Sequence, residues 1–194
     1  MFTTVGDVLY RSDNSGETFT AIAGVSGARD VAVTPDGSVF VSTDGGTLVS
    51  VDGGLGYNPA GSSPVGITTL YTSASEPGVI YGVAFRQGDG GMYRFDGNEW
   101  TQLLDDFFSH GVAVDPSNAQ NLAVVTTEPA FNDVSGATGV YLSSDGGATW
   151  TAITEGLPMR RLRTAEFDPS EPDRLVVGTT GRGFYEISFL AALG

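Results

Sequence analysis

The stretch Val140-Tyr-Leu-Ser-Ser-Asp-Gly-Gly-Ala-Thr-Trp-Thr-Ala-Ile153 decides the fold, because it recurs along the chain. It aligns without a gap with residues 9–22, and seven positions are identical. Residues 48–57 form a third copy and residues 92–101 a shortened fourth. The closing aromatic residues lie 38, 43 and 50 residues apart: Phe19, Tyr57, Trp100 and Trp150. The mean of about 44 residues is the period of a four-stranded propeller blade.

A second repeated element lies upstream of each copy. It is a short apolar strand that ends in a turn, at residues 31–37, 112–118 and 165–171, with a degenerate version at 69–77. Asp, Pro, Ser, Asn and Gly are the residues that form tight turns. Another β-rich run follows each turn, and no long window has helical periodicity. Each unit therefore contains four strands, A to D, with a turn between A and B and the repeated corner between C and D.

The repeats predict an all-β protein with a single propeller domain over residues 1–194. It would contain about four to five blades of roughly 44 residues, and the units fall at about 1–24, 28–60, 66–104, 111–157 and 164–190. The two ends are incomplete, since the first unit supplies only part of B, then C and D, and the last supplies A, B and C. A small self-closed ring is favoured. A four-bladed ring with one displaced strand and an open half-ring closed by another copy are the alternatives.

The repeated corners are expected to be structural. An Asp or Asn side chain can accept hydrogen bonds from its own turn, glycine supplies a positive φ, and the aromatic ring packs on a neighbouring blade. The residues concerned are Ser12, Asn14, Gly16, Phe19, Ser50, Asp52, Gly54, Tyr57, Asp96, Trp100, Ser143, Asp145, Gly147, Thr149 and Trp150.

The corner from Ser143 to Trp150 resembles the Asp-box, or BNR, motif, whose pattern is Ser-x-Asp-x-Gly-x-Thr-Trp. The copy that begins at Ser50 has Gly56 in place of the motif Thr and Tyr57 in place of the Trp. The copy that begins at Ser12 has Asn14 in place of the Asp and Phe19 in place of the Trp. With its turns, the chain is similar to the β-propellers of sortilin-type receptors, Asp-box glycosidases and photosystem-assembly factors. The resemblance implies the fold, but the motif occurs across unrelated activities.

The charge balance excludes several classes of partner. The net charge is −14, all nine basic residues are arginine, and there is no cysteine. Nucleic acids and anionic membrane surfaces are disfavoured, because both need cationic proteins. No apolar run approaches the ~20 residues of a membrane span, so no membrane insertion is expected. Acidity without lysine suggests either a salt-loving source, because salt screens self-repulsion, or an ordinary acidic protein from a GC-rich genome.

Strand parity predicts two different faces. The A–B turns and the corners share one face, and the more variable B–C and D–A connections share the other. Variable loops on a rigid scaffold are the usual place for binding. The candidate binding residues on this loop face are Arg160, Arg161, Arg163, Phe107, Phe108, His110, Arg86 and Phe131. The alternative is that these arginines pair with acids and the phenylalanines close the ends of the propeller.

These features favour a non-catalytic recognition or scaffold module that binds a protein, a glycan or copies of itself. No catalytic residue, metal site or cofactor is predicted. Two alternatives stay open: a structural or attachment protein of a virus of a halophilic host, and a glycoside hydrolase, which needs two carboxylates about 5–10 Å apart. The N-terminus has no basic and apolar leader. The chain is therefore expected to be made in the cytoplasm, where it stays or is assembled into a virion.

Overall fold

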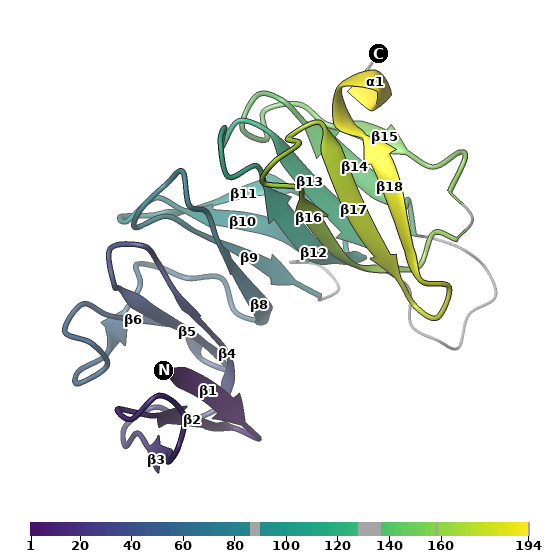
Figure 1. The fold of residues 1–194 in the computed structure, drawn as a ribbon. Helices are drawn as coiled ribbons and strands as arrows, with labels where there is room; N and C mark the ends of the chain where they lie inside the picture. The colour runs from purple at the N-terminus through teal and green to yellow at the C-terminus, as the bar shows by residue number, and fades with distance from the viewer. Residues whose placement is uncertain (86–89, 128–136, 158, 194) are drawn as a thin grey trace.

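The computed structural model describes residues 1–85, 90–127, 137–157 and 159–193, and within them the chain is almost entirely β-structure. Eighteen strands form five antiparallel sheets, and one short helix, α1 (Phe189–Leu193), ends the described chain (Figure 1). The all-β propeller-type fold predicted from the repeats is confirmed.

Each sheet is a meander of strands that are consecutive in the sequence. The first and second sheets contain β1 (Phe2–Val5), β2 (Val8–Arg11), β3 (Thr20–Ala21), β4 (Ala28–Val33), β5 (Val39–Thr43), β6 (Gly46–Ser50) and β7 (Asn58–Pro59). The third and fourth contain β8 (Ile67–Thr72), β9 (Ile80–Ala84), β10 (Gly91–Phe95), β11 (Trp100–Leu104), β12 (Ser109–Val114), β13 (Leu122–Thr126), β14 (Val140–Ser143) and β15 (Thr151–Ile153). The last contains β16 (Leu162–Phe167), β17 (Arg174–Thr179) and β18 (Phe184–Ser188).

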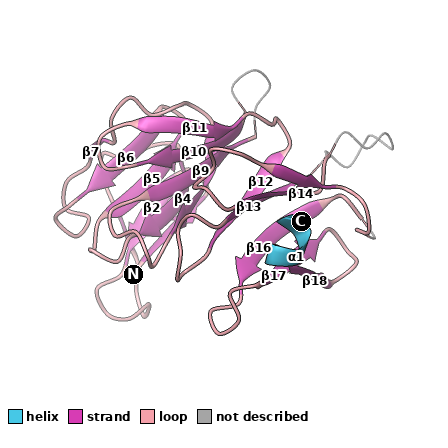
Figure 2. Cartoon of the chain, turned by 90° about the horizontal axis from the view of Figure 1, so that it is seen from above, coloured by secondary structure: helices cyan, strands magenta, loops and turns pink. Residues whose placement is uncertain are grey.

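The sheets stand side by side in an open arc, with the first and last sheets at its two ends (Figures 1 and 2). Four hydrophobic clusters hold the arc together, one between each pair of consecutive sheets. A closed ring of five sheets would need a fifth interface, and the described residues form none between the end sheets. The favoured expectation of a self-closed ring is therefore wrong for this chain, and the two end faces stay uncovered.

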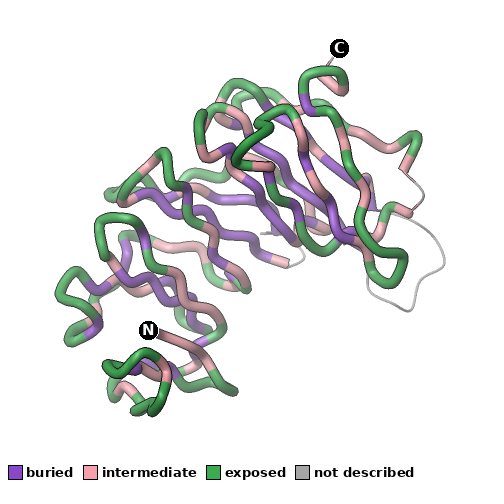
Figure 3. Tube along the Cα trace, viewed as in Figure 1, coloured by how far each residue is buried: buried purple, intermediate pink, exposed green. Residues whose placement is uncertain are grey.

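The inner strands explain how consecutive sheets meet. The A strands β4, β8, β12 and β16 pack against one another in order, and each also contacts the B strand of the preceding sheet. The first sheet begins with strand B, as expected, so β1 packs on β4 without an A strand of its own. The buried residues follow the centres of the strands, whereas the turns are exposed (Figure 3).

A β-bulge lies at the same place in each of the four A–B strand pairs. The register shifts between Ala28 and Asp30, between Ile67 and Thr69, between Ser109 and Gly111, and between Leu162 and Thr164. The bulged residues are Arg29, Thr68, His110 and Arg163. Bulges re-aim side chains and are common beside functional sites.

Helix α1 was not anticipated, because five residues are too few to produce a helical pattern in the sequence. The Asp173 carboxylate accepts hydrogen bonds from Leu190 N (2.5 Å) and Ser188 Oγ (2.8 Å), which fixes the start of the helix. Phe189 is fully buried and lies edge-on to Phe167, with ring centroids 5.2 Å apart. The helix thus packs beside β14 and β18, in a sheet that has no D strand.

The three complete corners have one hydrogen-bond pattern. In the corner at residues 143–150, Ser143 Oγ accepts from Gly147 N (2.9 Å) and donates to Asp145 Oδ1 (2.8 Å). Asp145 Oδ1 also accepts from Thr149 N (2.9 Å), and Thr149 Oγ1 donates to Oδ2 (2.6 Å). These bonds lower the pKa of Asp145 to about 2. Equivalent bonds surround Ser12 and Ser50, and Asp96 accepts two backbone bonds in the shorter corner.

The closing aromatic residue of each later corner packs on the preceding sheet. Trp100 Nε1 donates to the Ala60 carbonyl (2.8 Å) and Trp150 Nε1 to the Leu103 carbonyl (2.9 Å), both in the sheet before. Tyr57 belongs to the cluster between the first two sheets, but its buried hydroxyl has no hydrogen-bond partner. Tyr57 thus differs from Trp100 and Trp150, whose polar groups both have hydrogen-bond partners.

Tyr57→Phe is expected to stabilise the protein or leave it unchanged, with a gain of up to about 1 kcal/mol. The substitution keeps the ring and removes a buried hydroxyl that lost its water without gaining a partner. Chemical denaturation followed by fluorescence measures the change. A loss of more than about 1 kcal/mol would mean that this hydroxyl is bonded in solution.

Candidate binding face

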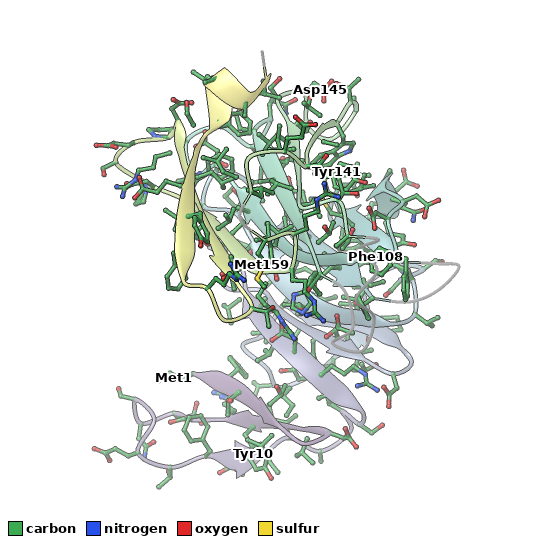
Figure 4. The ribbon with its side chains drawn as sticks, turned by 90° about the vertical axis from the view of Figure 1, so that its right-hand side faces the viewer. Met1, Tyr10, Phe108, Tyr141, Asp145 and Met159 are labelled. Atoms are coloured by element: carbon green, nitrogen blue, oxygen red, sulfur yellow. The ribbon has the colours of Figure 1, made fainter. Side chains whose placement is uncertain are left out.

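The loop face consists of the B–C and D–A connections and the first residues of the A strands. Phe107 and Phe108 lie in the connection that leads into β12, and Met159 lies in the one that leads into β16. In Figure 4, Phe108 and Met159 lie toward one end of their sheets and Asp145 lies at the other. The two-face arrangement predicted from strand parity is what the strand order produces.

Three phenylalanines form a half-exposed aromatic group on this face. Phe85 and Phe107 stack with ring centroids 5.0 Å apart, and Phe108 meets Phe107 edge-on at 5.0 Å. Asp106 holds the loop, because its Oδ1 accepts from Phe108 N (2.7 Å) and its Oδ2 from the Tyr141 hydroxyl (2.7 Å). The rings are therefore positioned by a polar turn and not by burial.

His110 and Arg163 join the fourth sheet to the fifth. Arg163 Nη1 donates to His110 Nε2 (3.1 Å), so His110 must carry its proton on Nδ1, which faces the Arg163 carbonyl at 3.2 Å. Burial lowers the pKa of His110, and the neighbouring Arg163 charge lowers it further. Both residues are the bulged residues of their strands, not loop residues as the sequence suggested.

Arg163→Ala is expected to raise the pKa of His110 toward its ordinary value without restoring it fully, because burial is the larger cause. His110 is the only histidine, so its ring protons can be titrated by NMR without assignment. Neutral His110 favours the folded state above its unfolded pKa, and this contribution is lost as the pH falls through the folded pKa. An unchanged titration in the variant would exclude the pairing with Arg163.

Arginines are distributed unequally between the two faces. On the turn face, Arg11 pairs with Asp13, Arg94 with Glu76, and Arg174 with Asp168 and Glu186. On the loop face, Arg29 pairs with Asp44. Within the described chain, no carboxylate lies within ion-pair distance of the loop-face residues Arg160, Arg163 and Arg182. Several aspartates instead accept hydrogen bonds from turns on the opposite face, among them Asp52, Asp115 and Asp145. The last sheet therefore has a basic end in a very acidic protein.

The predicted binding residues are brought together only in part. Phe107, Phe108 and His110 are adjacent, and His110 contacts Arg163 from the next sheet. Arg160 is exposed and Arg161 is half-buried in the connection before β16. Arg86 and Phe131 lie outside the described residues. The sequence analysis missed Phe85 and Arg182, although strand parity could have placed both in B–C connections.

Two shallow grooves lie on the opposite, turn face between neighbouring sheets. One of about 370 Å³ lies between the second and third sheets, with Asp36, Phe40 and Phe95 among its lining residues. One of about 340 Å³ lies between the third and fourth and is lined by Glu76, Tyr81 and Arg94. Glu76 accepts from Tyr81 (2.5 Å) and from Arg94 (2.8 Å), so its carboxylate is already satisfied. These grooves result from the way consecutive sheets meet at the rim.

The described residues contain no group of three or more metal-ligating side chains that could hold an ion. No helix among them has the length and apolar character needed to cross a bilayer. The geometry of the loop face therefore offers aromatic surface, guanidinium groups and one neutral imidazole.

Comparison with known proteins supports the fold alone. No protein-family model matches the chain, and no curated protein matches it. Among solved structures, it is similar to the GH74 enzyme of Niastella koreensis, with a TM-score of 0.71 and 22% identity over 95% of this chain and 35% of that one. A structure titled YCF48 bound to D1 peptide has a TM-score of 0.63 and 16% identity, over 94% of this chain and 57% of that one.

A further match is a structure titled nidogen/laminin complex, with a TM-score of 0.66 and 13% identity over 97% of this chain and 74% of the matched one. The chain spans about a third of the length of the GH74 enzymes it matches. The class defined by these likenesses and by the sheet arrangement is the β-propeller, here as an open arc of five blades.

Proposed function

We propose that this protein is a non-catalytic recognition module whose loop face binds an acidic segment of a protein partner. The single observation that carries the proposal is the unequal distribution of arginines. Every described arginine of the turn face pairs with an acid, whereas Arg160, Arg163 and Arg182 have no carboxylate partner among the described residues. Guanidinium groups that have no carboxylate partner on their own surface are suited to carboxylates supplied from outside.

The aromatic group contributes the second half of the proposed site. Phe107 and Phe108 are half-exposed and lie directly before His110, which contacts Arg163. Interfaces are enriched in aromatic residues and arginine, and a few such residues supply most of the binding energy. The expected partner is thus an acidic segment with an apolar side chain. One structural neighbour is described as peptide-bound, which agrees with this class of ligand.

The proposal also interprets the repeated turns as Asp-boxes. The bonding around Ser12, Ser50 and Ser143 supports this interpretation, because the side chains satisfy only their own turns. In this proposal the turn face is a rigid rim and the loop face is the functional side.

Fluorescence anisotropy with a labelled ten-residue glutamate peptide containing one phenylalanine tests the site, in 0.1 M salt. The triple variant Arg160→Ala, Arg161→Ala and Arg163→Ala is expected to lose binding at least about 100-fold, since each charge-assisted bond is worth roughly tenfold. The matched control changes Arg11, Arg94 and Arg174 to alanine on the turn face. If both triple variants lost peptide affinity equally, the effect would come from net charge and not from the loop face. Binding of oligogalacturonate in place of the peptide would favour a glycan ligand.

A glycosidase role is the alternative suggested by the GH74 likeness. We propose that the chain is not an enzyme, because the aspartates of the repeated corners bond to their own turns, as Asp52 and Asp145 do. Incubation with xyloglucan and measurement of reducing ends tests this, and sustained release of sugar by the purified protein would overturn it.

A high-salt environment is the second proposal that composition supports. With a net charge of −14, the chain is expected to unfold at a higher temperature in 2 M than in 0.1 M sodium chloride. Differential scanning calorimetry at both concentrations measures this change. Equal midpoints would remove the reason for assigning the protein to a halophilic host or its virus.

A further inference from the structure

The first sheet has one face that no other part of the described chain covers. Side chains alternate along β1 and β2, so Phe2, Thr4 and Leu9 point toward the second sheet and pack there. Thr3, Val5, Val8 and Tyr10 consequently point away from it. We call this surface the outward face of the first sheet and add Met1 and Phe19, which lie beside Gly16 of the same sheet.

The outward face is apolar and exposed. Met1 is 66% exposed, Val5 63%, Phe19 41% and Val8 36%. These are four of the ten exposed large hydrophobic residues of the described chain. None of the side chains that define the face is charged, and the Met1 ammonium donates to the Ser12 carbonyl (2.8 Å). Contiguous exposed apolar surface on a soluble protein usually marks a contact site.

The equivalent positions in the other sheets are all interfaces. Tyr10 corresponds to Leu48, Tyr93, Tyr141 and Tyr185, and each of these packs into the cluster shared with the preceding sheet. Phe19 likewise corresponds to Tyr57, Trp100 and Trp150, which pack on the preceding sheet. The outward face of the first sheet therefore has apolar residues at the positions that, in the other four sheets, pack against a preceding sheet.

The other end of the arc is built differently. The outward face of the last sheet carries Glu166, Arg174 and Glu186, and the last two are ion-paired. Glu166 stands where the earlier A strands have Ala32, Tyr71 and Ala113. Burying such a face against an apolar sheet would leave a carboxylate without water or a partner. This face also carries the exposed Phe184, but its charged side chains make it more polar than the outward face of the first sheet.

We propose that the outward face of the first sheet is covered by the same face of a second copy, related by a two-fold axis. Head-to-tail closure would place Glu166 of one copy against Val5 and Tyr10 of the other, whereas head-to-head pairing joins two faces that have no charged side chain. Copies with a net charge of −14 repel, and these faces, which have no acidic side chain, offer the approach of least repulsion. The basic end of the loop face belongs to the last sheet, which lies at the opposite end of the arc from the first (Figure 1), so this pairing leaves it uncovered.

Sedimentation velocity at about 10–200 µM protein in 2 M sodium chloride tests the proposal. Six residues define the face, fewer than the roughly 20–30 per side of a standard interface, so a dimer with a dissociation constant in the micromolar range is expected. The double variant Val5→Glu and Val8→Glu should weaken association at least tenfold. The control Phe184→Glu alters an exposed side chain of the last sheet and should leave it unchanged.

Cysteine cross-linking identifies which faces meet without relying on destabilising charges. The chain has no cysteine, so Val5→Cys or Phe184→Cys introduces a single thiol. Short bismaleimide linkers should join two Val5→Cys chains and should not join Val5→Cys to Phe184→Cys. A monomer at 200 µM in high salt, or linkage only between Val5→Cys and Phe184→Cys, would overturn the proposal. Peptide binding to the loop face is measured separately and does not depend on this result.

Discussion

Trp150→Ala is expected to reduce the free energy of unfolding by about 3–5 kcal/mol, as is typical for large aromatic residues packed in a core. Trp150 packs into the cluster between the third and fourth sheets, and its Nε1 donates to the Leu103 carbonyl (2.9 Å). Its ring also lies 3.3 Å from the position of a Cβ atom at Gly147, so the indole closes the corner as well as the interface. Guanidinium chloride unfolding followed by circular dichroism measures the loss.

Phe19→Ala is the matched control, because Phe19 has the same place in the first corner but no preceding sheet. It is 41% exposed, so its removal should cost only about 1 kcal/mol at micromolar protein. Similar losses at the two positions would mean that the aromatic residue stabilises its own corner and not the interface between sheets. Trp150→Phe should lie between them, since it keeps most of the ring and leaves the Leu103 carbonyl without a donor.

Gly91→Ala is expected to be as damaging, with a loss of about 3–5 kcal/mol or failure to fold. Gly91 begins β10 with φ +129°, a value that residues with a Cβ atom rarely adopt. A Cβ atom there would lie 2.0 Å from the Leu104 carbonyl oxygen of the neighbouring strand. Relief of this contact would require β10 and β11 to separate at their first pair. Yield of folded protein and the unfolding midpoint both report the effect.

Gly37→Ala separates the cost of the positive φ from the cost of the steric contact. Gly37 also has a positive φ, +88°, but nothing lies within 4 Å of a Cβ atom at that position. Its replacement should cost only the backbone strain, about 1 kcal/mol. If the two substitutions were equally harmful, the close approach to Leu104 would not be the reason that position 91 requires glycine.

Much of the fold could be predicted because its units are local. The corner around Ser143 and Asp145 is closed by hydrogen bonds that span four residues, so the sequence of that segment suffices to specify it. Period-two alternation and turn residues then define each meander, and strand parity assigns every connection to a face. The candidate site followed in part from the same parity, which placed Phe107, Phe108 and Arg163 on one side.

Contacts between distant residues could not be predicted in this way. The sequence shows His110 and Arg163 53 residues apart, and only the packing of β12 against β16 joins them. Their position at β-bulges was equally hidden, because a bulge depends on the register of two strands. The stacking of Phe85 on Phe107 also depends on two connections that meet at the end of one sheet.

The sequence by itself determined the repeated four-stranded unit, its corners and its turns, because these features arise from neighbouring residues. It also determined the excess of acidic over basic residues, which is a property of composition. The tertiary structure alone decided that the five sheets form an open arc and that the helix packs beside the last sheet. The reason is that closure depends on the angle between consecutive sheets and on what the two end faces would bury. One end face is apolar, with Val5 and Tyr10, and the other carries Glu166 and Arg174, so the same repeat has different surroundings at its two ends.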